Sequence, residues 1–175
     1  MNINKYVFLD LDGVLNHSNW YNNPERIELK YTLGELESDY DPTCISHLNH
    51  IIDKVPDVKI VLTSTWRLST SKDLDKYGNY PEGIITALMN AGLKCNIYGS
   101  TPSVQNRRDV EIMDFIYNDS TDPYVFVILD DDDFYSNSVH SEVLAPRFIQ
   151  TNYFESGLTM ENANAVIDLL KWQGE

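Results

Sequence analysis

Carboxylate and hydroxyl side chains occur in three short groups of this sequence that could do chemistry together. Asp10 and Asp12 stand two positions apart, Thr63 and Ser64 are adjacent, and aspartates occupy every position of 130–133. Two carboxylates about 4 Å apart repel each other by about 4 kcal/mol at an effective dielectric constant of about 20. A site that gathers several of them therefore needs a bound proton or a cation.

The ligand types favour one cation and one kind of reaction. Oxygen ligands without a His or Cys cluster favour Mg²⁺, which also accepts the oxygens of a substrate phosphate. In such a site one Asp carboxylate can attack phosphorus and form an aspartyl-phosphate. A second Asp two residues further on can give a proton to the leaving alcohol and then activate water. Gly13, which follows Asp12, would allow the sharp turn that brings both to one phosphate.

Short apolar runs that favour β-structure precede the three polar groups. The clearest runs are residues 5–9, 58–62 and 124–129, and weaker ones are residues 93–98 and 147–150. Each clear run is followed directly by one of the polar groups. Because ligands of open parallel sheets bind at the carboxyl ends of the strands, we expect the three groups to meet at one edge of a sheet.

Amphipathic patterns between these runs predict helices. Asp41 and Pro42 offer an N-cap and a proline at the first helical position, and an apolar stripe follows them. Three further helices are predicted after Pro81, after Pro102 and near Thr159. Strands separated by helices of this length imply βαβ crossovers. We therefore expect a three-layer α/β fold, with a mainly parallel sheet flanked by helices.

One segment does not follow this alternation. Residues 16–40 are rich in Asn, Tyr and Glu and show no sustained periodicity. We interpret them as a flap or hairpin beside the site, so that residues 1–175 form a single domain with a minimal cap.

Composition narrows the class of partner and the compartment. The net charge of −14, with 27 acidic against 13 basic residues, opposes nonspecific binding to a phosphate backbone, so we expect no stable duplex binding. It favours a site that needs a cation to accept an anionic substrate.

No apolar run approaches the roughly 20 residues of a membrane span, and no export signal is evident. Cys44 and Cys95 are expected to be buried free thiols, and the expected location is cytoplasmic.

The motifs together resemble those of a known superfamily. The sequence DLDGV at residues 10–14, after an apolar strand, resembles motif I of the haloacid dehalogenase-like (HAD) phosphatases. The other three motifs of that superfamily are matched in order by residues 63–64, 107–108 and 130–131. The resemblance covers most of the chain and implies a Rossmann-like HAD fold.

The resemblance also implies roles for individual residues. Asp10 would be the nucleophile and Asp12 the general acid and base. Asp130, with Asp131, would hold Mg²⁺ together with Asp10 and the backbone carbonyl of Asp12.

Two of the motifs leave a choice between neighbouring residues. Either Thr63 or Ser64 would bind the phosphate, and we favour Ser64. The basic motif usually holds one Lys or Arg, whereas here Arg107 and Arg108 are adjacent. We favour Arg108, because RDVEI at residues 108–112 resembles the Arg-Gly-x-Glu-Ile helix start of one HAD branch.

That branch is the small, nearly capless HAD domain of RNA-repair enzymes and related proteins. Its Ser/Thr-Ser/Thr-x-Trp-Arg pattern is similar to TSTWR at residues 63–67. Trp66 could stack on a base and Arg67 could bind phosphate, whereas a packing tryptophan beside an exposed arginine is the simpler alternative. We include Gly13 and Arg107 with them as candidate substrate-binding residues.

The predicted function is Mg²⁺-dependent hydrolysis of a phosphomonoester, and the open site favours a bulky substrate. We expect a nucleotide or a nucleic-acid terminal phosphate, in particular a 3′-phosphate. Two alternatives stay open: a phosphatase of small molecules such as 5′-nucleotides or sugar phosphates, and a noncatalytic HAD-like module that binds a metal or a protein. The oligomeric state is not indicated by the sequence.

Overall fold

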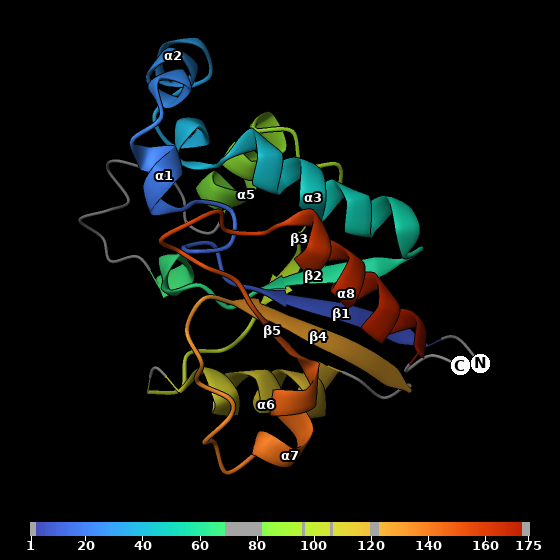
Figure 1. Cartoon of the computed structure of the whole chain (residues 1–175). Coiled ribbons are helices and arrows are strands. Elements are labelled where there is room, and N and C mark those ends of the chain that lie inside the picture. Colours follow the sequence, from blue (N-terminus) through green and yellow to red (C-terminus); the bar gives the residue numbers. More distant parts are fainter. Residues whose placement is uncertain (1–2, 69–81, 96, 106, 120–122, 173–175) are drawn as a thin grey trace.

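A five-stranded sheet lies at the centre of the structure (Figure 1). The computed structural model describes residues 3–68, 82–95, 97–105, 107–119 and 123–172, without the side chains of Arg67, Leu68, Asp119 and Trp172. The strands are β1 (Asn4–Leu9), β2 (Val58–Leu62), β3 (Ile97–Ser100), β4 (Tyr124–Asp130) and β5 (Phe148–Gln150). Their order is β3-β2-β1-β4-β5, and every neighbouring pair is parallel. The expected α/β fold is confirmed, with a sheet that is parallel throughout.

The strand register aligns the three polar groups. Leu9, the last residue of β1, pairs with Leu62 of β2 and with Leu129 of β4. The backbone ladder continues one step further, because Asp10 N donates to Leu129 O at 3.0 Å and Thr63 N donates to Leu9 O at 2.9 Å. The residues that follow these strands therefore begin at the same level of the sheet.

Helices cover both faces of the sheet (Figure 1). One face carries α3 (Pro42–Lys54), α5 (Glu82–Asn90) and α8 (Met160–Trp172), and the other carries α6 (Arg108–Asp119) and the short α7 (Ser141–Leu144). Short 3₁₀ turns are η1 (Glu37–Asp39), η2 (Thr65–Leu68) and η3 (Ala145–Arg147). The alternation of β1 explains the two layers, since Val7 and Leu9 enter one buried cluster whereas Tyr6 and Phe8 enter the other.

The predicted helix starts agree with the structure with one exception. Asp41 caps α3 by accepting a hydrogen bond from Thr43 N at 2.7 Å, and Pro42 is the first helical residue. The predicted helix after Pro81 is α5, although Pro81 itself lies outside the described residues. The helix expected after Pro102 begins only at Arg108.

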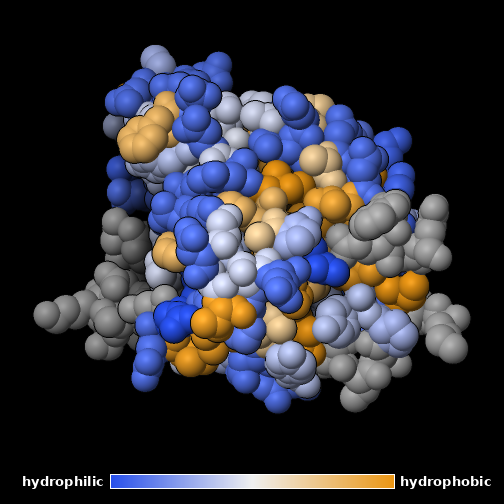
Figure 2. Space-filling model, turned by 60° about the horizontal axis from the view of Figure 1, so that its bottom comes forward, coloured by the Kyte–Doolittle hydropathy of each residue, from blue (hydrophilic) through white to orange (hydrophobic). Residues whose placement is uncertain are grey.

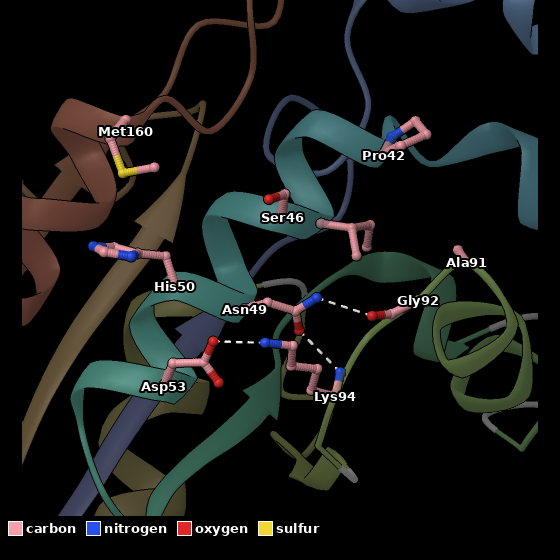
Figure 3. Close-up of a pocket in the computed structure, with 10 residues that line it drawn as sticks. Pro42, Ser46, Asn49, His50, Asp53, Ala91, Gly92, Lys94 and Met160 are labelled. Carbon is pink, nitrogen blue, oxygen red and sulfur yellow. Dashed lines mark hydrogen bonds and ion pairs between the residues drawn. The ribbon is translucent and has the colours of Figure 1, made fainter.

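The weak strand predicted for residues 93–98 was wrong at its start, because β3 begins at Ile97. The backbone before β3 is bonded to helices instead: Leu93 N donates to Leu88 O, and Lys94 N donates to Asn49 Oδ1 at 2.9 Å. Figure 3 shows how Asn49 of α3 bridges Lys94 and the carbonyl of Gly92 beside a pocket of about 340 Å³.

The segment of residues 16–40 is helical, where we expected a flap or hairpin. It contains α1 (Ser18–Tyr21) and α2 (Pro24–Thr32). Trp20 anchors the segment, since its buried indole donates to Ser38 O at 3.0 Å. No residue of α2 is buried, and Figure 1 shows this helix projecting from the body. Its role as a flap stays a prediction.

The surface on the side of α6 and α7 contains both hydrophobic and polar residues. Figure 2 shows hydrophobic areas there that are surrounded by polar residues. Exposed hydrophobic side chains in this part of the chain include Phe134, Val139 and Val143.

Candidate functional site

Three carboxylates meet at the carboxyl edge of the sheet. Asp10 follows β1, Asp130 is the last residue of β4, and Asp131 comes next. One carboxylate oxygen of each lies within 4.8 Å of the others. Asp10 is 2% exposed and Asp130 is 0% exposed, so their charges are removed from water. The expected meeting of the first and third groups is therefore observed.

Arg108 brings a positive charge into this cluster. It is the first residue of α6, and its Nη1 lies 2.9 Å from Asp10 Oδ2 and 2.6 Å from Asp130 Oδ2. Arg107 instead pairs with Asp109 at 2.8 Å, with a side chain that is 53% exposed. The helix start thus turns Arg108 toward the acidic edge and leaves Arg107 beside its own helix. This geometry favours Arg108 as the basic residue of the site.

Burial controls the protonation of the cluster. Burial and the neighbouring charge of Asp10 raise the pKa of Asp130 to about 7. Burial, with the charges of Asp132 and Asp10, raises the pKa of Asp131 to about 6. Burial also raises the pKa of Asp10, against the attraction of Arg108. The single guanidinium does not compensate all of the buried negative charge.

The donor set of the cluster fits a divalent cation. When ionised, Asp10, Asp130 and Asp131 carry three negative charges and Arg108 carries one positive charge, which leaves a formal balance of −2. Asp10 Oδ1 is buried and accepts no hydrogen bond from any described residue. Carboxylate oxygens are the ligands that Mg²⁺ prefers. The cluster could therefore hold the expected cation.

The carboxylate of Asp12 lies outside this three-residue cluster. Its Oδ1 accepts a hydrogen bond from Asn16 Nδ2 at 2.9 Å, and its Oδ2 accepts one from Trp66 Nε1 at 2.6 Å. Asp12 as a metal ligand through its backbone carbonyl stays a prediction. Asn16 was not predicted, and its position four residues after Asp12 is the only signal in the sequence that could have indicated it.

Trp66 therefore has a contact that the sequence did not indicate. We expected its ring to stack on substrate or to pack. The ring does pack against the larger buried cluster, with its centroid 6.4 Å from that of Tyr40, and in addition its indole N–H donates to Asp12. Substrate stacking by Trp66 stays a prediction. The side chain of Arg67 lies outside the described part of the chain.

Thr63 and Ser64 stand at the end of β2, beside the cluster. Both are buried, and Ser64 Oγ accepts a weak hydrogen bond from Trp66 N at 3.3 Å. A hydroxyl in this position can donate to a bound phosphate. The preference for Ser64 over Thr63 stays a prediction.

Gly13 makes room for an acidic side chain. It has φ +71°, and a Cβ added there would overlap the Asp131 carboxyl group. Its N–H donates to Asn16 Oδ1 at 3.1 Å, and its carbonyl accepts from Thr151 Oγ1 at 2.7 Å. Only glycine combines this backbone conformation with the close approach of Asp131. Direct substrate binding by Gly13 stays a prediction.

The acidic loop after β4 contains residues with different roles. Tyr135, buried, donates its hydroxyl to Asp130 Oδ2 at 2.9 Å, and Asp132 N donates to Asp130 Oδ1 at 3.1 Å. Asp133 is exposed and accepts from Tyr135 N at 3.0 Å, so it forms the turn. Sequence reasoning missed Tyr135, because no repeating pattern around it indicated that its hydroxyl returns to Asp130.

A second group of metal-binding residue types is closed by hydrogen bonds. His17, Asp41 and Cys44 lie together and are buried. His17 Nδ1 accepts from Trp20 N at 3.3 Å, so the proton is on Nε2, which donates to Asp41 Oδ2 at 2.8 Å. Burial raises the pKa of the Cys44 thiol to about 12. Each of the three side chains already has a hydrogen-bond partner, so we interpret this group as a structural network.

Comparison with known proteins identifies the family. A profile described as the HAD domain in Swiss Army Knife RNA repair proteins matches residues 6–163, which span the whole acidic edge. No curated protein and no solved structure matches the chain significantly. Among the described residues, no helix is long and apolar enough to cross a membrane. The matched segment contains β2, β3, β4 and β5 whole, and β1 from Tyr6 onward. The chain therefore belongs to the family of HAD domains found in Swiss Army Knife RNA repair proteins.

Proposed function

We propose that this protein is a Mg²⁺-dependent phosphomonoester hydrolase that works through an aspartyl-phosphate on Asp10. The observation that carries the proposal is the surroundings of Asp10. Its Oδ2 is 2.9 Å from Arg108 Nη1, its Oδ1 has no hydrogen bond from a described residue, and two more carboxylates lie within 4.8 Å. Membership of the HAD family supports the same class of reaction.

The first half of the reaction transfers the phosphoryl group to the protein. One carboxylate oxygen of Asp10 attacks phosphorus, the bond from phosphorus to the leaving oxygen breaks, and Asp12 gives its proton to that oxygen. Mg²⁺ held by Asp10, Asp130 and Asp131 would neutralise charge on the phosphate oxygens. Arg108 contacts both Asp10 and Asp130 and adds positive charge at the same place.

The second half returns Asp10 to its starting state. Asp12, now ionised, takes a proton from water while the water oxygen attacks phosphorus. The bond between phosphorus and Asp10 breaks, and inorganic phosphate leaves. The hydroxyl of Ser64 or Thr63 orients the phosphate in both steps.

The preferred substrate is a nucleotide or a nucleic-acid terminal phosphate, in particular a 3′-phosphate. The RNA-repair family supports this choice. The net charge of −14 opposes tight binding of a duplex, so we expect a single nucleotide or chain end to enter the site. Cytoplasmic action fits this substrate class.

One panel of substrates tests the proposal. Purified protein with Mg²⁺ is given 3′- and 5′-phosphorylated oligonucleotides, mononucleotides and sugar phosphates, and released phosphate is measured. We expect hydrolysis of nucleotides or ends that disappears in Asp10→Asn and persists in Asp133→Asn, because Asp133 forms a turn outside the cluster.

The outcomes separate the alternatives. Hydrolysis that persists in Asp10→Asn contradicts the assigned nucleophile. Hydrolysis of sugar phosphates with nucleotides and oligonucleotides untouched contradicts the substrate class. No hydrolysis of any substrate by the unmodified protein with Mg²⁺ contradicts the reaction itself.

A further inference from the structure

The two carboxylate oxygens of Asp130 have different surroundings. Oδ2 accepts from Arg108 Nη1 at 2.6 Å and from the Tyr135 hydroxyl at 2.9 Å, whereas Oδ1 accepts from Asp132 N at 3.1 Å. An ionised carboxylate has about four acceptor positions on its two oxygens. Donors from the described part of the chain therefore fill both positions of Oδ2 and leave one position, on Oδ1, for a cation.

The two donors to Oδ2 differ in what else they contact. Arg108 Nη1 also lies 2.9 Å from Asp10 Oδ2, so its positive charge is shared between two carboxylates. In the proposed reaction, a phosphate group at Asp10 would compete for the same guanidinium. Among the described residues, the Tyr135 hydroxyl is hydrogen-bonded to Asp130 alone. It can therefore hold Oδ2 in place whatever the guanidinium contacts.

Packing fixes the position of the Tyr135 hydroxyl. The side chain is 0% exposed, and its ring centroid lies 4.9 Å from that of Phe148 and 6.2 Å from that of Phe134. The ring belongs to the buried cluster that β1 and β4 share with α6. A ring enclosed in a close-packed interior does not change rotamer without displacing its neighbours. The hydroxyl is thus held at Asp130 by the core of the protein rather than by the acidic loop alone.

We propose that Tyr135 is a positioning residue for the divalent cation, because its hydroxyl holds Oδ2 of Asp130 and keeps Oδ1 available to the ion. Hydrogen bonds to metal-binding carboxylates orient these ligands, and losing one typically lowers metal affinity by about 10–100-fold. Mg²⁺ requires near-ideal octahedral geometry, whereas Ca²⁺ accepts irregular coordination. Tyr135 therefore matters more for Mg²⁺ than for Ca²⁺. This inference rests on the proposed Mg²⁺ site but not on hydrolysis, since cation binding can be measured by itself.

Tyr135→Phe removes the hydroxyl and keeps the ring. Arg108 still contacts Asp130 Oδ2 in this variant, so the buried carboxylate keeps a partner and the fold should persist. We expect the Kd for Mg²⁺, measured by calorimetry, to rise by about tenfold or more, and the Kd for Ca²⁺ to rise less. In the hydrolysis assay, the Mg²⁺ concentration that gives half of the maximal rate should rise, while kcat at saturating Mg²⁺ should change little.

Tyr6→Phe is the matched control. Tyr6 is 0% exposed and belongs to the same buried cluster as Tyr135. It precedes Asp10 by four residues of β1, which is about 13 Å of extended chain. Removing its hydroxyl should leave both the Mg²⁺ affinity and the preference for Mg²⁺ over Ca²⁺ unchanged.

The calorimetric results distinguish the role of Tyr135 from the metal site itself. Equal Mg²⁺ affinity in Tyr135→Phe and in the unmodified protein overturns the role of Tyr135 and leaves the site in place. A loss of affinity that is the same for Mg²⁺ and Ca²⁺, or that Tyr6→Phe reproduces, is a general structural effect and also overturns it. No Mg²⁺ binding by the unmodified protein overturns the site and the role together. If Mg²⁺ binds as expected and no phosphate ester is hydrolysed, the role of Tyr135 stands and the phosphatase function fails.

Discussion

The indole Nε1 of Trp66 donates a hydrogen bond to Asp12 Oδ2 at 2.6 Å, and this bond joins the residues that follow β1 and β2. Asn16 Nδ2 binds the other oxygen of the same carboxylate at 2.9 Å. Asp12 is therefore held by two neutral donors, apart from the three carboxylates beside it. In the proposed mechanism these donors set the position of Asp12 for proton transfer.

Trp66→Phe keeps the ring and removes the donor. We expect kcat to fall by about tenfold, because a carboxylate that has lost one donor is less well placed for proton transfer. The measurement compares kcat of Trp66→Phe and of the unmodified protein for the same phosphate ester.

The matched control is Trp20→Phe. It removes a similar indole hydrogen bond, to Ser38 O, in the helical segment before α3. It should cost about 1 kcal/mol of stability and leave kcat unchanged. A kcat that is the same in Trp66→Phe as in the unmodified protein would show that Trp66 does not act through Asp12.

Mg²⁺ should stabilise the protein more at high pH than at low pH. The pKa values of Asp130, about 7, and Asp131, about 6, lie above the ordinary value of 3.8. The folded, metal-free protein therefore binds these protons more tightly than the unfolded chain, and its stability falls as pH rises from about 4 to 7. Protons and the cation compete for the same oxygens.

Thermal unfolding measures this effect. We expect the increase in Tm on adding Mg²⁺ to be larger at pH 8 than at pH 5, and to be lost in Asp131→Asn. Asp133→Asn should keep it, because Asp133 accepts backbone hydrogen bonds outside the cluster. An increase that is equal at both pH values would contradict ligation by the carboxylates with raised pKa.

Low pH should destabilise the start of α6, because it protonates the carboxylate of Asp109. Burial alone would raise the pKa of Asp109, but hydrogen bonds from Arg107 and Ser138 lower it to about 2. A lowered pKa contributes stability above the ordinary value of 3.8, and this contribution is lost as pH falls through about 2. Asp109→Asn should therefore unfold more easily at pH 6, with a difference from the unmodified protein that narrows toward pH 2. Chemical denaturation at several pH values checks this, and a constant difference would argue against it.

Gly13→Ala should damage the site through Asp131. The new methyl group meets the Asp131 carboxyl group in a backbone conformation with φ +71° that alanine adopts poorly. We expect a loss of about 1–3 kcal/mol of stability together with loss of the Mg²⁺ response. Gly92→Ala is the matched control, since its φ is +105° but a Cβ there meets only Ile45, at 3.9 Å. It should lower stability and retain the Mg²⁺ response, which unfolding curves with and without Mg²⁺ would show.

The main features of the site were predictable because they depend on strand ends. Apolar runs before Asp10, Thr63 and Asp130 predicted where the parallel strands end. The register of β1 with β2 and β4 places these residues at the same level of the sheet. The partners of the carboxylates were not predictable. Asn16 and Tyr135 reach Asp12 and Asp130 from loops whose conformation depends on packing rather than on a repeating pattern.

The fold differed from expectation where hydrophobicity was a poor guide. The run at residues 93–98 contains Leu93, which packs in the core. The backbone at Leu93 and Lys94 is nevertheless bonded to α5 and Asn49 rather than to a strand. The strand β3 begins only at Ile97 and includes Gly99. Residues 16–40 lack an apolar stripe, yet Pro24 and the Asn23 cap begin a helix without burying any of its residues. Local capping signals outweighed periodicity in this segment.

The direction of the first strand and the last helix has a consequence for engineering. β1 starts, and α8 finishes, at the margin of the sheet opposite Asp10 (Figure 1). An affinity tag, a fluorescent reporter or a neighbouring module joined beyond either element would therefore start at the margin away from the proposed active site. Such fusions should leave turnover unaltered, which makes either end suitable for tethering the protein to a surface in the assays described above.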